Sequence, residues 1–138
     1  MNRDATFSPD QRAIWVGRIL SGLAALFLTF DAVVKLLMLP IALEANSQLG
    51  YPPSVIPVLG LIEIACLGVY LFPRTAVLGA ILWTGYLGGA VATHVRVGNP
   101  LFSQTLFPIY VAGLLWAGLW LRDRRVHVLI ESPGSLER

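Results

Sequence analysis

The sequence is poor in charged residues and in the residue types that build common catalytic centres. Charged residues make up only 13% of its 138 residues, while 56% are hydrophobic. The single cysteine, Cys66, excludes an intrachain disulfide and a two-cysteine thiol relay within one copy. There are two histidines, no zinc-ligand spacing, no glycine-rich phosphate loop and no GxSxG motif. We therefore expect no metal site and no haem within one copy.

Long apolar runs dominate what is present, and the mean hydropathy of +0.70 lies outside the range of soluble globular proteins. A helix that crosses a hydrocarbon core of about 30 Å needs roughly 20 predominantly apolar residues. Four runs meet this requirement, over about 13–39, 55–72, 75–95 and 102–121. We predict an all-α integral membrane four-helix bundle in antiparallel, up-down-up-down order, with a polar segment at 1–12 and a basic interfacial segment and polar tail at 122–138.

The basic residues favour one side of this arrangement. With four crossings only Arg96 falls on one side, and the other side holds Arg3, Arg12, Arg18, Arg74, Arg122, Arg124 and Arg125. Positive residues favour the cytoplasm, so both termini are expected inside. We attribute the net charge of +2 to the orientation of the protein in the membrane and not to a nucleic-acid surface. The expected partners are therefore membrane lipids, not nucleic acid. The first run is longer than a signal-peptide core and carries Asp31 and Lys35, so we keep it as a span.

The longest connection, residues 40–57, follows the first span. Residues 41–49 are predicted to form a short helix at the outer interface that ends at Gly50. Tyr51-Pro52-Pro53 then turns the chain back toward the membrane. Before the fourth span, Ser103 is expected to cap the helix.

Small residues recur every four positions in two of the spans. They are Gly17, Ser21 and Ala25 in the first span and Gly85 and Gly89 in the third. Such spacing lets helix backbones pack closely in lipid, either within one copy or between two copies of a homo-oligomer.

Ionisable side chains inside the apolar runs are the main functional signal. A charge in hydrocarbon is costly unless it faces a bundle interior or a wet cavity. A rise of about 1.5 Å per residue places Asp31 and Glu63 level with each other, each about 12 Å below the outer face. Lys35 lies above them, and His94 and Arg96 arrive near the outer end of the third span. All five groups therefore belong to the outer half.

Asp31 and Lys35 lie four residues apart, acid before base, so we expect them to pair. The pair is either part of a site or a structural lock on helix rotation. Glu63 has no partner on its own helix and must be protonated, reach Lys35, or meet His94 or Arg96. His94 is close enough to the interface to be either a site residue or an anchor.

Short motifs along the chain carry a family resemblance. In order they are Asp31-Val-Val-Lys35, Leu49-Gly-Tyr-Pro-Pro53, Gly60-Leu-Ile-Glu63 and Thr93-His-Val-Arg-Val-Gly98. Over about residues 13–121 the chain resembles the DoxX-like family of small four-helix bacterial membrane proteins. The resemblance implies that Lys35, Glu63, His94 and Arg96 occupy positions that the family fills with those residue types, and it implies the bacterial inner membrane as location. The family's namesake relatives are associated with a thiosulfate:quinone oxidoreductase, but one cysteine does not support a thiol-based version.

These residues predict a site for a small lipophilic molecule, such as a quinone or an isoprenoid, with acid-base or redox-linked chemistry. Glu63 is the expected proton donor or acceptor, Lys35 and His94 tune its charge or bond a carbonyl, and Asp31 orients Lys35. Further ligand contacts are expected from Arg96, Cys66 and Tyr51. The residues leave the cofactor unknown, with a quinone as one candidate. A redox role would need a partner, because the chain has no visible electron carrier.

Two alternatives stay open. A proton-coupled, oligomeric small transporter would use Glu63 as its coupling carboxylate. A non-catalytic accessory or assembly subunit of a membrane complex would use the polar residues only to hold the helices in register. The sequence does not decide whether the protein is an enzyme.

Overall fold

The computed structural model describes residues 9–131 and is built from helices. In chain order these are α1 (Pro9–Leu36), α2 (Pro40–Gln48), the 3₁₀ turn η1 (Pro53–Val55), α3 (Ile56–Leu71), α4 (Ala76–Arg96), the π-helical turn η2 (Leu101–Thr105), α5 (Phe107–Arg122) and α6 (Arg124–Glu131). Arg3 and the polar tail beyond residue 131 lie outside the described residues.

Four helical segments are long and apolar enough to cross a membrane. They are Asp10–Leu36, Pro53–Leu71, Ala76–Arg96 and Leu101–Arg122. Many of their large apolar side chains face outward, among them Leu26, of which 69% is exposed, and Phe30 at 60%. Outward apolar faces are what a lipid-embedded bundle requires. The predicted all-α membrane bundle is therefore confirmed.

Local residue chemistry explains where the helices stop. Gly50, with φ 80°, follows α2, as the sequence predicted, because a left-handed residue after a helix is easiest for glycine. Gly98, with φ 71°, follows α4 in the same way. The start of α5 differs from the expected one: Ser103 lies inside η2, and α5 begins at Phe107 with Pro108 in its first turn and no side-chain cap. Proline suits the first turn because its missing N–H has no helical partner there.

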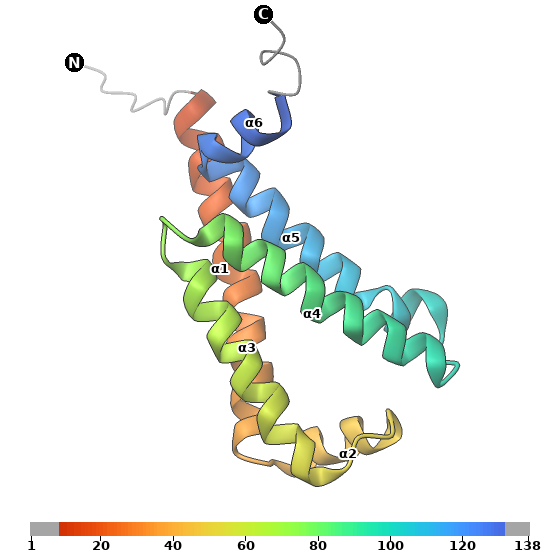
Figure 1. The fold of residues 1–138 in the computed structure, drawn as a ribbon. Helices are drawn as coiled ribbons and strands as arrows, with labels where there is room; N and C mark the ends of the chain where they lie inside the picture. Colours follow the sequence, from red (N-terminus) through yellow and green to blue (C-terminus); the bar gives the residue numbers. More distant parts are fainter. Residues whose placement is uncertain (1–8, 132–138) are drawn as a thin grey trace, which may run out of the picture.

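The four long helices form a ring in which α1 contacts α3 and α5, and α4 contacts the same two helices. In Figure 1 the chain reverses direction between successive long helices. The pair α1 and α3 diverges from the pair α4 and α5 toward the end that carries α2. At the opposite end, where α6 lies, the pairs converge (Figure 1). We call these the α2 end and the α6 end.

The convergence depends on small residues. A Cβ added at Gly118 would lie 2.4 Å from Ser21 Oγ, so α1 and α5 can touch only without a side chain there. In the core beside this contact, Tyr70 is fully buried, donates a hydrogen bond to the carbonyl of Leu115 at 2.9 Å and lies 3.0 Å from Ser21 Oγ. Trp83 is also fully buried. The core between the helices is closely packed at this end.

Candidate functional site

A cluster of three charged side chains joins α1 to α3; we call Asp31, Lys35 and Glu63 the charge cluster. Lys35 Nζ lies 2.6 Å from Asp31 Oδ2 and also donates a hydrogen bond to Glu63 Oε1. Glu63 is fully buried and Lys35 is 9% exposed, whereas the Asp31 side chain is 37% exposed. The predicted Asp31–Lys35 pair is confirmed. Of the alternatives for Glu63, the structure selects contact with Lys35.

Gly60 lets the two helices approach at this point. A Cβ at Gly60 would lie 2.9 Å from the carbonyl oxygen of Ala32 and 3.1 Å from Lys35 Cβ. Three residues later on the same helix face, Glu63 is directed toward α1. The spacing of glycine and glutamate therefore brings the carboxylate to the ammonium group.

Tyr86 of α4 completes the contacts of Glu63 and was not predicted from the sequence. Its hydroxyl donates to Glu63 Oε1, and Lys35 Nζ lies 6.0 Å from the centre of its ring. A tyrosine in the middle of a span has a hydroxyl that needs a partner. That requirement was the available signal, but it does not say which partner.

The charge cluster holds two carboxylates and one ammonium group. With all three ionised its net charge is −1, and one further proton makes it neutral. Glu63 Oε2 is buried and has no hydrogen-bond partner among residues 9–131, so it can carry that proton without losing a hydrogen bond. The geometry thus allows the cluster to take up or release one proton.

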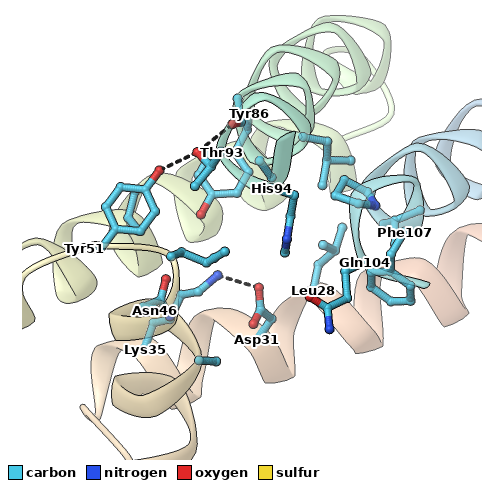
Figure 2. A pocket seen from close by; sticks show the side chains of 18 of the residues that line it. Leu28, Asp31, Lys35, Asn46, Tyr51, Tyr86, Thr93, His94, Gln104 and Phe107 are labelled. Atoms are coloured by element: carbon cyan, nitrogen blue, oxygen red, sulfur yellow. Dashed lines mark hydrogen bonds and ion pairs between the residues drawn. The ribbon is translucent and has the colours of Figure 1, made fainter. Parts of the chain in front are cut away.

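A cavity of about 580 Å³ lies between the diverging helix pairs at the α2 end. Figure 2 shows Asp31 and Lys35 from α1, His94 from α4 and Gln104 from η2 around it. Apolar residues supply much of the remaining wall, including Phe27, Leu28, Ile62, Phe107 and Val111. The volume falls within the roughly 300–1,000 Å³ typical of small-molecule sites. This is the candidate functional site.

His94 faces the cavity with a defined orientation. Asn99 Nδ2 lies 2.8 Å from His94 Nδ1, and because an amide nitrogen only donates, Nδ1 is the acceptor. The neutral ring then carries its proton on Nε2, which has no partner within the described residues. The ring can therefore donate a hydrogen bond to a molecule in the cavity.

Two contacts attach the α2 connection to α4 beside the cavity. Thr93 Oγ1 donates to the carbonyl of Gly89 at 2.9 Å, so Tyr51, whose hydroxyl lies 2.9 Å from Thr93 Oγ1, is the donor in that contact. Arg96 Nη2 donates to the carbonyl of Leu49 at 2.6 Å. Tyr51 lines the cavity, whereas Arg96 holds its wall from outside.

Besides Arg96, two of the residues selected from the sequence lie off the cavity wall. Cys66 packs in the buried core with Leu67 and Trp83. Glu63 lies behind Lys35 and Tyr86, which do line the cavity. Asp31, with its partly exposed carboxylate, is instead the acid that faces the open space.

Comparison with known proteins gives one match. The model of the DoxX-like family matches residues 19–118, a range that includes the charge cluster and the whole cavity lining. No curated protein and no solved structure matches the chain.

Proposed function

The chain belongs to the DoxX-like family of membrane proteins, and we propose that it binds a small lipophilic molecule bearing a carbonyl or hydroxyl group, such as a quinone or an isoprenoid, in the cavity at the α2 end. One observation carries the proposal: apolar walls enclose about 580 Å³ into which Asp31, Lys35 and His94 converge. An apolar pocket with a few convergent polar groups is the usual form of such a site.

The polar residues have different roles in ligand binding and proton exchange. His94 Nε2–H donates to an oxygen of the ligand, and the Lys35 ammonium group supplies positive charge beside it. Asp31 exchanges a proton with the ligand, because its carboxylate is the one exposed to the cavity. Glu63 acts through Lys35 as a positioning residue that holds the ammonium group and stores the cluster's additional proton.

A quinone fits this set of donors, since its two carbonyl oxygens accept hydrogen bonds and its reduction couples electron gain to proton uptake. The chain's residues supply only binding and the proton, so redox chemistry requires an electron-transfer partner. An isomerisation of an isoprenoid would need only the acid and the base.

The membrane orientation follows from the arginines. Arg12 and Arg18 in the first turns of α1, Arg74 between α3 and α4, and Arg122 at the end of α5 all belong to the α6 end. By the positive-inside preference that end and both termini are cytoplasmic, in the inner membrane of a bacterium, and the cavity lies in the outer half.

A lipophilic ligand reaches the cavity from the bilayer between α1 and α5. Phe27 and Phe107 form an edge-to-face pair with ring centres 5.5 Å apart. Both residues line the cavity, and 42% and 44% of their surfaces are exposed. This aromatic pair between α1 and α5 is therefore the proposed place of entry.

Calorimetric titration of the purified full-length protein in uncharged detergent with decylubiquinone and with farnesol tests the site. We expect saturable binding of one probe class, and Asp31→Asn should weaken it about tenfold, the loss of one interaction of about 1.4 kcal/mol. Glu44→Gln is the matched control, because it removes an exposed carboxylate of α2 outside the cavity. Absence of binding by both probes, or equal weakening by both variants, would contradict the proposal.

Glu63→Gln separates the three functional classes. Retained probe binding with loss of proton exchange identifies acid-base or redox chemistry. Loss of pH-driven uptake in proteoliposomes identifies a proton-coupled transporter. Lower stability as the sole effect, with no probe bound by the parent protein, identifies an accessory subunit.

A further inference from the structure

A second pocket, of about 500 Å³, lies at the α6 end and is separate from the cavity. It is bounded by the first turns of α1, the end of α5 and by α6. Ile14, Trp120 and Leu121 provide apolar wall, and Arg122 and Arg124 provide positive charge. The pocket is therefore amphiphilic.

Arg122 is the unusual residue of this pocket. Its Nε and Nη2 atoms are buried and have no hydrogen-bond partner among the described residues, and no carboxylate of residues 10–128 lies within 4.0 Å of it. Its guanidinium group lies 5.2 Å from the ring centre of Tyr70. A ring face offsets only part of the cost of burying a cation, so no described residue fully compensates the charge of Arg122.

The acidic residues of the pocket do not supply that anion. Asp123 Oδ1 accepts a hydrogen bond from the backbone N–H of Arg125 at 2.9 Å and thereby caps the first turn of α6. Asp10 lies in the first turn of α1, a position that suits a carboxylate by itself. Neither forms an ion pair with Arg122 in the part of the chain that the structure describes.

Contacts between α5 and α6 hold the wall of the pocket in place. The ring of His127 stacks on Trp120 with ring centres 4.0 Å apart, and its Nε2 lies 2.9 Å from the carbonyl oxygen of Trp120. These contacts fasten α6 against the end of α5, so that Arg122 and Arg124 face the pocket together.

We infer that this pocket binds a phosphate group, with Arg122 and Arg124 as its cationic partners. A guanidinium group matches the oxygens of a phosphate in geometry and charge. The apolar wall and the position at the end of the spanning helices favour the headgroup of an anionic lipid over free phosphate as the source. The inference does not depend on the function proposed for the cavity.

The test uses delipidated full-length protein in uncharged detergent, titrated with short-chain phosphatidylglycerol, with diacylglycerol of the same chain length and with inorganic phosphate. We expect saturable binding of phosphatidylglycerol, none of diacylglycerol, and weakening of about tenfold or more in Arg122→Gln. Arg124→Gln, at an exposed position, should weaken binding less and keeps the test valid if Arg122→Gln fails to fold. If millimolar phosphate displaces the lipid, the pocket binds the phosphate group itself, and free phosphate is a ligand of the same site.

Arg74→Gln is the matched control, because it removes one exposed arginine from the same end of the bundle outside the pocket. It should leave the affinity unchanged within about twofold. Equal weakening by Arg74→Gln and Arg122→Gln would mean diffuse attraction to a basic surface and would overturn the site. Absence of saturable binding by both phosphatidylglycerol and phosphate would overturn it as well.

Discussion

Gly118 at the α6 end lies against a neighbouring helix, whereas Gly85 and Gly89 of α4 face open space. A Cβ at Gly118 would come within 2.4 Å of Ser21 Oγ, but one at Gly85 or Gly89 would meet no heavy atom of a neighbouring segment within 4 Å. Gly85 and Gly89 line the cavity instead. At these positions the same residue type therefore allows close packing in one place and leaves room for the cavity in the other.

The two ends also differ in what stabilises them. At the α6 end the buried side chains are mainly apolar and closely packed, with Trp83 and Leu119 fully buried. At the α2 end the helix pairs diverge. There Lys35 joins Asp31 and Glu63 within the pair α1 and α3, and Tyr86 of α4 donates a hydrogen bond to Glu63. Close packing stabilises one end, whereas charge compensation joins α1 to α3 at the other. A bundle built in this way can keep a polar, ligand-sized space in hydrocarbon without losing its fold.

Removing the cation of the charge cluster should have the largest effect. Lys35→Met leaves the buried Glu63 carboxylate without its ammonium partner and should lower the free energy of unfolding by about 3–5 kcal/mol. Adding Glu63→Gln to that variant should recover much of the loss. Thermal unfolding in detergent, followed by circular dichroism, measures both. Equal stability of the single and double variants would show that charge compensation does not hold the α2 end.

Replacing a packed glycine and a cavity-lining glycine by valine should have different effects on stability and on binding. Gly118→Val forces a side chain into α1 and should destabilise the protein by about 1–3 kcal/mol, because the backbone cannot yield there. Gly89→Val should leave the unfolding midpoint nearly unchanged and weaken probe binding in the cavity. If both variants unfold at the same temperature, the proposed difference between the two ends is wrong.

The smallest effect is expected from single hydrogen bonds. Tyr70→Phe removes a hydroxyl that contacts Ser21 and Leu115 in the packed end, and should cost about 0.5–1.5 kcal/mol. Tyr110→Phe removes an exposed hydroxyl whose bond to the Phe102 carbonyl is long, at 3.4 Å, and serves as control. Chemical denaturation in mixed micelles measures the free energy of unfolding of both variants. A larger loss of stability in Tyr110→Phe than in Tyr70→Phe would contradict this prediction.

Features confined to one helix or one turn were predictable from the sequence. Four apolar runs of spanning length define the spans, because length and composition alone decide whether a helix can cross hydrocarbon. Asp31 and Lys35 pair because four residues place them on one face of the same helix. Gly50 ends α2 because its positive φ suits glycine.

Contacts between helices were not predictable in the same way. Glu63 had several candidate partners, and only the packing of α1, α3 and α4 assigns it to Lys35 and Tyr86. Only packing, too, directs Arg96 to the carbonyl of Leu49 and encloses Cys66 in the core.

The physical reason lies in the solvent. In water, the apolar face of a helix identifies its buried side, but in a bilayer the lipid-facing and core-facing sides are both apolar, and the rotation of each helix is hidden. By itself, the sequence determined which segments span the membrane and which charges they carry. The tertiary structure alone decided which charges meet, because that depends on how each helix is turned and where the two pairs diverge.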